Sequence, residues 1–117
     1  MNTKRLGDDG EEEAARHLSA LGWDVVARNY RRREGEIDLI VRRDTTLAFV
    51  EVKTRRSDRF GTPGEAVTFR KAARIRLLAR RFLLEHGAHA DQIRFDVIEV
   101  TRFRGSASRV THIEGAF

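Results

Sequence analysis

The sequence predicts an α/β fold in which a mixed β-sheet is flanked by helices. The first observation is the order of the local patterns: a helix-like segment, three strand-like segments, a second helix, and one or two further strands. The second is size, since 117 residues with 40% hydrophobic side chains suit a single domain with its own core. The third is the absence of cysteine, which excludes a disulfide framework and any cysteine-ligated metal site.

The first helix is predicted over residues 10–22, where acidic residues suit the positive end of the helix dipole and Gly22 is a typical stop signal. Apolar residues recur along it at helical spacing: Ala14, Ala15, Leu18 and Leu21. Glu11 lies on the same stripe, so we expect its carboxylate to face the sheet. The alternative is an acid in the first turn that serves only the helix dipole.

Three β-rich segments follow. Residues 23–30 are predicted as a short strand, and the basic residues 31–33 lead into a turn. Residues 35–43 and 46–53 are predicted as the strands of a hairpin, with the two residues between them as its loop.

The second half of the chain also contains a helical segment and strand-like segments, after a loop. Residues 54–64 are polar, hold the only proline and are predicted as a loop. A long helix is predicted over residues 65–86, because apolar residues recur at spacings of three and four, and Gly87 closes it. Residues 93–100 are predicted as a strand, and residues 109–117 as an optional last one.

The hairpin is expected to bring two carboxylates together. Counting outward from its two-residue loop places Asp38 opposite Glu51, and directly opposed residues share a face with Cβ atoms about 4.5–5.5 Å apart. By the same count Lys53 lies on this face, opposite Glu36. Because two facing carboxylates repel, we expect Lys53 to neutralise part of their charge and a divalent metal to neutralise the rest.

The alternative for this hairpin is a solvated sheet face with compensating charges. Three apolar residues weaken that interpretation, because they are expected on the same face as the acids: Ile40, Leu47 and Phe49.

Arginine dominates the charge of the chain. There are 20 Arg and three Lys, with a formal charge of +5 and a pI near 10.6. Guanidinium groups contact phosphate through paired hydrogen bonds, which suits a nucleic-acid partner, whereas a GC-rich genome would produce the same excess. No apolar run reaches the length of a membrane helix and no signal peptide is evident, so the protein is expected to be soluble and cytoplasmic, without a membrane partner.

Several motifs together resemble a known family. They are GEEEA, RNYRRREGEIDLI, FVEVKTR, GTPGEAV followed by Lys71, and RFDVI. In this order they resemble the YraN-like family of small bacterial proteins, which belongs to the restriction-endonuclease-like superfamily and is similar to archaeal Holliday-junction resolvases. The resemblance spans about residues 7–100, and HIEGAF resembles the family's C-terminus. Ile37 stands where the superfamily usually has proline.

The resemblance implies one nuclease-like domain over residues 1–117. Its αβββαβ core would span about residues 7–100, followed by a C-terminal strand or tail at 101–117. The implied activity is hydrolysis of phosphodiester bonds in DNA, branched or junction DNA included, by an Mg²⁺-dependent endonuclease that acts as a homodimer.

The residues that match the superfamily's acids and lysine are the implied catalytic set: Glu11, Asp38, Glu51 and Lys53. By resemblance, Asp38 and Glu51 would hold Mg²⁺ or Mn²⁺ together with the Val52 carbonyl. Glu11 would assist them, and Lys53 would activate the attacking water.

Basic residues near this set are candidate nucleic-acid contacts: Arg31, Arg32, Arg33, Arg55, Arg56, Arg59 and Lys71. The three at positions 55, 56 and 59 are expected in the loop after Lys53, where they would hold a nucleic-acid backbone, and a solvated loop is the alternative. Lys71 can equally face solvent.

Two further expectations concern structure. Asp96 is expected to form an internal ion pair or a polar sheet edge, and the aromatic residues are expected to lie in the core.

A second functional hypothesis is a non-catalytic nucleic-acid-binding or partner-binding module that retains the nuclease fold. Facing carboxylates would repel a phosphate backbone unless a metal lay between them, which favours the nuclease.

Overall fold

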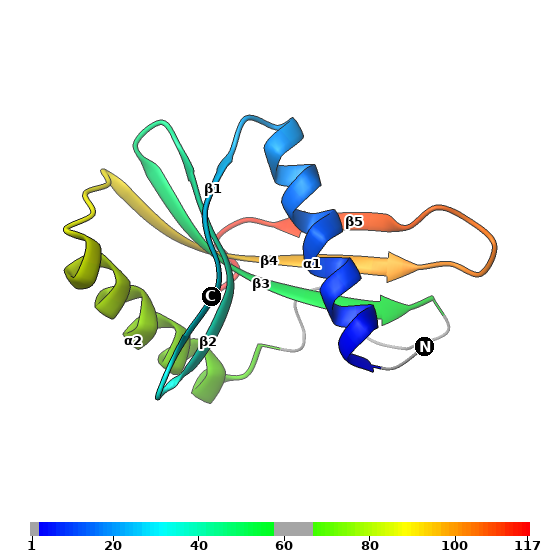
Figure 1. The fold of residues 1–117 in the computed structure, drawn as a ribbon, viewed down its shortest axis with the longest axis horizontal. Helices are drawn as coiled ribbons and strands as arrows, with labels where there is room; N and C mark the ends of the chain where they lie inside the picture. Colours follow the sequence, from blue (N-terminus) through cyan, green and yellow to red (C-terminus); the bar gives the residue numbers. More distant parts are fainter. Residues whose placement is uncertain (1–2, 58–66) are drawn as a thin grey trace.

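The described part of the chain folds into a five-stranded sheet with one helix on each face (Figure 1). The computed structural model describes residues 3–57 and 67–117, with side chains from residue 9 onward. Its elements are α1 (Thr3–Ala20), β1 (Asp24–Arg32), β2 (Gly35–Arg43), β3 (Thr46–Arg56), α2 (Phe69–His86), β4 (Gln92–Arg102) and β5 (Arg109–Ile113). This order confirms the predicted α/β class, including the last strand, and is compatible with a restriction-endonuclease-like core.

The strands follow one another across the sheet in chain order, from β1 to β5. All neighbouring pairs are antiparallel except β3 and β4, which run parallel because the chain returns through α2. The parallel pair is the longest ladder, running from Thr46 opposite Gln92 to Arg56 opposite Arg102. The sheet is therefore mixed, as predicted.

Alternating side chains of β2 and β3 divide the core into two layers. The layer under α1 includes Leu39, Val41, Ala48, Val50, Ala14, Ala15 and Leu18. The layer under α2 includes Ile40, Leu47, Phe49, Ile75, Leu78 and Phe82. The predicted shared face of Ile40, Leu47 and Phe49 is thus confirmed. Neither helix in the described residues has an apolar stretch that would carry it across a membrane.

Helix α1 begins at Thr3, seven residues before the predicted start, and ends at Ala20. Glu11 therefore lies well inside the helix, and the interpretation of it as a first-turn acid was wrong. Gly10 lets the helix approach β3 closely, because a Cβ atom at this position would lie 1.9 Å from Oγ1 of Thr54.

Helix α2 begins at Phe69 and not at residue 65 as predicted. Val67 and Thr68 precede it, and the Thr68 side chain caps it by accepting a hydrogen bond from the Lys71 N–H (3.1 Å). Gly87 ends it in the left-handed region (φ 55°), as predicted. The Phe69 ring is 93% exposed, so the expectation that the aromatic residues lie in the core fails here.

Strand β3 extends three residues beyond its predicted end at Lys53. Arg55 and Arg56 lie on this strand, paired with β4, because the parallel ladder continues past the apolar segment. Their predicted placement in a loop was wrong, and Arg59 falls outside the described residues.

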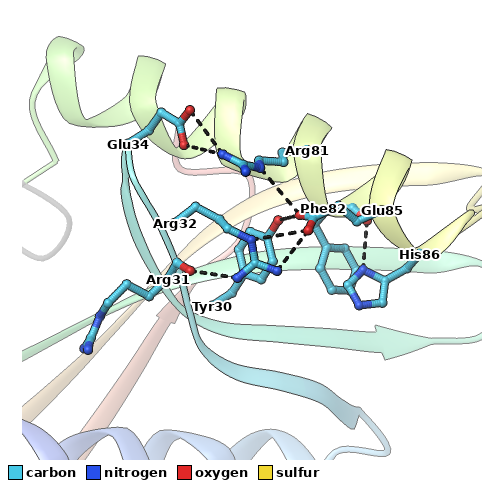
Figure 2. A network of polar contacts seen from close by, with 8 residues as sticks. All are labelled: Tyr30, Arg31, Arg32, Glu34, Arg81, Phe82, Glu85 and His86. Carbon is cyan, nitrogen blue, oxygen red and sulfur yellow. Dashed lines mark hydrogen bonds and ion pairs between the residues drawn. The ribbon is translucent and has the colours of Figure 1, made fainter.

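Figure 2 shows how the β1–β2 hairpin is fixed to α2. Arg81 on the helix donates to Glu34 in the hairpin turn (2.9 Å), and Arg32 donates to Glu85 on the helix (3.0 Å). The Tyr30 hydroxyl donates to the same Glu85 carboxylate. These contacts hold the hairpin turn beside the helix.

We expect Gly10→Ala to destabilise the fold by about 1–3 kcal/mol, because the new methyl group would collide with Thr54. In an uncrowded helix the same change would raise stability, so a loss of stability indicates that α1 approaches β3 closely at Gly10. Chemical unfolding followed by circular dichroism measures it. Adding Thr54→Ala should restore part of the loss, whereas equal or higher stability of Gly10→Ala alone would contradict the close approach.

Candidate functional site

The site lies where β2 and β3 separate. The predicted hairpin register is confirmed from Arg43 opposite Thr46 to Leu39 opposite Val50, and the ladder stops there. Asp38 and Glu51 lie one position beyond the last pair. The ladder does not reach Glu36, so the predicted pairing of Glu36 with Lys53 was wrong. Glu36 pairs instead with Arg31 on β1.

The Asp38 carboxylate closes the end of the ladder. Its Oδ2 accepts a hydrogen bond from the backbone N–H of Val52 (2.8 Å), a position that a strand carbonyl would otherwise fill. This contact fixes the Asp38 side chain between the two diverging strands.

Glu51 is a buried acid held between two lysines. Its side chain is 6% exposed, and Oε1 lies 3.8 Å from Nζ of Lys53 and 2.5 Å from Nζ of Lys71. Lys53 follows Glu51 along β3, whereas Lys71 comes from the first turn of α2. The structure therefore places Lys71 against the acids, and the solvent-facing alternative was wrong.

The surroundings of Asp38 disfavour its charged form. Burial, followed by the charge of Glu51, raises the pKa of Asp38 to about 8. Glu11 and Glu36 act in the same direction, and the hydrogen bond from Val52 opposes them. The pocket around Asp38 thus holds too little positive charge to keep its carboxylate ionised at neutral pH.

The lysines are also shifted, in opposite directions. Burial lowers the pKa of Lys53, and the neighbouring Lys71 ammonium lowers it further. Burial is the largest influence on Lys71 and opposes its charged form, but the hydrogen bond to Glu51, the charge of Glu51 and smaller contributions from Lys53 and Asp38 together outweigh it and raise the pKa of Lys71. Lys71 is therefore the firmer counter-ion of Glu51.

Asn29 links Glu11 to the hairpin, and the sequence interpretation missed it. The Asn29 amide, oriented by its hydrogen-bond partners, donates to Glu36 (2.7 Å) and to Glu11 (3.1 Å). Asn29 has φ 51°, a left-handed conformation that asparagine tolerates better than most residues. An asparagine inside a strand-like segment was the available signal.

A cavity of about 230 Å³ adjoins the acids. It lies between the β1–β2 turn and the start of α2, the region where these two elements approach in Figure 1. Its walls come from three hairpin residues and four helix residues: Glu34, Gly35, Glu36, Lys71, Arg74, Ile75 and Leu78. Lys71 and Glu36 belong both to this cavity and to the surroundings of the acids.

Most of the other candidate basic residues interact with protein groups, Arg56 among them, and several are also exposed. Arg31 donates to Glu36 (3.1 Å), Arg32 to Glu85, and Arg55 to the buried Glu99 (3.2 Å). Arg33, in the β1–β2 turn, and Arg56, at the end of β3, are exposed. The structure thus gives the side chains of Arg31, Arg32 and Arg55 protein partners.

The donors at the ladder end suit a hard divalent cation. Two carboxylates and a nearby backbone carbonyl, all oxygen, match the one or two carboxylates plus waters that Mg²⁺ prefers. The raised pKa of Asp38 marks a site that gains from added positive charge. Among the described side chains, no group of three or more His, Cys, Asp or Glu lies close enough to enclose a metal.

Asp96 lies in a separate cluster. It is fully buried and accepts hydrogen bonds from Arg94 (2.9 Å) and from the Gly115 N–H (3.0 Å), and His112 Nε2 lies 2.7 Å away. Burial opposes ionisation, but these partners outweigh it and lower the pKa of Asp96. The predicted internal ion pair is confirmed.

The comparison with family models matches residues 10–100 to the uncharacterised protein family UPF0102. This chain belongs to the UPF0102 family. It is 54% identical to a UPF0102 protein of Beutenbergia cavernae over 110 residues, covering 94% of this chain and 93% of the relative. A UPF0102 protein of Symbiobacterium thermophilum is 47% identical over 115 residues, covering 98% of both chains. The YraN-like resemblance drawn from the motifs is confirmed at this level.

The matched segment of this UPF0102 chain contains the whole constellation around the ladder end: Glu11, Asn29, Asp38, Glu51, Lys53 and Lys71. Its boundaries coincide with Gly10, where α1 meets β3, and with Val100 near the end of β4.

The raised pKa of Asp38 predicts a pH dependence of stability. The folded protein holds a proton on Asp38 up to about pH 8, whereas the unfolded chain releases it near pH 4, so stability falls as pH rises through this window. Asp38→Asn retains an oxygen for the Val52 N–H but cannot ionise. We expect it to match the wild type in stability near pH 4 and to exceed it by about 1.4 kcal/mol for each pH unit of this window, which is about 5 kcal/mol at pH 8.

Thermal unfolding in EDTA between pH 4 and pH 8.5 measures this difference. Asp44→Asn, at an exposed hairpin turn, is the control and should follow the wild-type profile. Parallel profiles for Asp38→Asn and the wild type would contradict the assignment.

Proposed function

We propose that this UPF0102 protein is a metal-dependent nuclease that hydrolyses phosphodiester bonds in DNA, with branched or junction DNA as the first substrates to test. One observation carries the proposal: the Asp38 carboxylate, whose pKa is raised by burial and by the charge of Glu51, lies near Glu51, and two lysines contact Glu51. A site that holds acids beside cations is suited to a phosphate group and a divalent ion together.

Asp38 and Glu51, with the Val52 carbonyl, are the proposed ligands of Mg²⁺ or Mn²⁺. When bound, the ion would lower the pKa of a water molecule and stabilise charge on the phosphoryl oxygens. The hydrogen bond from Val52 to Asp38 orients one ligand in advance, and burial of Glu51 limits the motion of the other.

Lys53 is the proposed proton carrier and phosphate contact. Its ammonium lies within 4 Å of Glu51, and its lowered pKa makes exchange of a proton with the attacking water easier. The charged form donates to a phosphoryl oxygen as negative charge develops there.

Glu11 is proposed to act at the edge of this group. It reaches the site from α1 and raises the pKa of Asp38 through its charge, which places it close to the ligands. The Asn29 amide donates hydrogen bonds to both Glu11 and Glu36, so it fixes the distance between α1 and the β1–β2 hairpin.

The proposed partner is DNA, held by exposed cations around the site. The formal charge of +5 favours binding to a polyanion. Exposed arginines flank the acids on several elements: Arg33 in the β1–β2 turn, Arg56 on β3, and Arg70 and Arg74 on α2. A homodimer would present two such sites to a two-stranded substrate.

The test is cleavage of labelled linear, single-stranded, flap and four-way DNA with Mg²⁺, Mn²⁺ or EDTA. We expect metal-dependent cutting that falls by about 100-fold or more in Asp38→Asn, Glu51→Gln and Lys53→Met, as for loss of one preorganised electrostatic group. Asp24→Asn, an exposed acid on β1, is the matched control and should cut as the wild type does.

Wild-type rates in the three site variants would contradict the site. Binding of DNA without metal and without cutting, on every substrate, would instead support a binding module that retains the nuclease fold.

A further inference from the structure

The shortest ion pair of Glu51 is made with the helix that follows β3 in the chain, not with its own strand. Lys71 Nζ lies 2.5 Å from Glu51 Oε1, against 3.8 Å for Lys53 Nζ. Both ammonium groups address the same carboxylate oxygen. The nearer one comes from a residue 20 positions along the chain.

Contacts of its backbone and of neighbouring helix residues fix the position of Lys71. Its backbone N–H donates to the Thr68 side chain, which caps α2. Ile75 and Leu78, one and two turns further on, are buried against the sheet and fix the rotation of the helix. The Lys71 side chain is 33% exposed, so water reaches one side of it while the other side faces Glu51.

A divalent cation at this site and the Lys71 ammonium would both neutralise the carboxylate of Glu51. Two cations at one carboxylate repel, and the buried surroundings of Glu51 weaken the screening of that repulsion. The ion pair seen here therefore opposes coordination of a metal by Glu51.

We propose that Lys71 is a displaceable counter-ion of the candidate metal site. It neutralises Glu51 while no divalent cation is bound, leaves Glu51 when the cation arrives, and so sets the affinity of the site for metal. Lys71 acts through Glu51 and is a positioning residue. This inference rests on the proposed function, because it concerns the metal ligands named there.

The test measures Mn²⁺ binding to the full-length protein without DNA, by electron paramagnetic resonance of free Mn²⁺. We expect Lys71→Met, which retains an apolar stem and loses the charge, to lower the Kd for Mn²⁺ by about tenfold, in line with loss of a charge-assisted contact. Lys71→Arg retains the charge and should stay within about twofold of the wild type.

Arg80→Met is the matched control. It removes one positive charge from a later turn of α2, at an exposed residue for which the described structure shows no contact with Glu51. We expect its Kd for Mn²⁺ to stay within about twofold of the wild type.

Thermal unfolding gives a second readout. In EDTA, Lys71→Met should unfold at a lower temperature than the wild type, because Glu51 keeps only its more distant partner. Saturating Mn²⁺ should raise the Tm of this variant by more than it raises that of the wild type.

The outcomes separate this inference from the proposed reaction. Unchanged or weaker Mn²⁺ binding by Lys71→Met, while the wild type binds metal and cuts DNA, overturns the role of Lys71 alone. Tighter Mn²⁺ binding by Lys71→Met without cutting by any form of the protein supports the counter-ion and overturns the nuclease. Absence of Mn²⁺ binding in both proteins overturns the metal site and this inference together.

Discussion

The separation of β2 from β3 after the pair Leu39–Val50 is the constraint on which the site depends. If the ladder continued, Val52 would donate to a strand carbonyl and the space beside it would be filled. Because it stops, the Asp38 carboxylate accepts that hydrogen bond and is held between the strands. The hairpin that carries β2 away is in turn fixed to α2 by Arg32, Glu85 and Tyr30, as Figure 2 shows. The separation of β2 from β3 therefore determines both the path of the hairpin and the position of the Asp38 carboxylate.

A fully buried aspartate, Asp96, and a half-buried one, Asp38, illustrate what distinguishes a structural acid from a candidate functional one. Asp96 has an arginine, a histidine and a backbone N–H as partners, and its pKa is lowered. Asp38 has one backbone N–H and a second acid nearby, and its pKa is raised. Burial acts against the charged form in both, so the number of donors decides the direction. A carboxylate left short of donors is available to an external cation.

The sequence predicted what local rules determine. The loop at Asp44 and Thr45 defined the β2–β3 register, and that register brought Asp38 and Glu51 together before any tertiary information. Lys71 could not be assigned, because its contact with Glu51 depends on how α2 packs across the sheet. The strand positions of Arg55 and Arg56 were missed because pairing with β4, and not apolar alternation, extends β3. Asn29 was missed because its positive φ departs from the strand pattern around it.

The cluster around Asp96 has a consequence for synthesis of the chain. Translation is vectorial, so β4 emerges with its acid before His112 and Gly115 exist to hold it. Until then only Arg94, two residues earlier on the same strand, accompanies this carboxylate. The nascent sheet therefore carries an incompletely neutralised charge at a position that ends fully buried. Pairing of β5 with β4 brings His112 and the Gly115 N–H to this carboxylate and completes its set of partners.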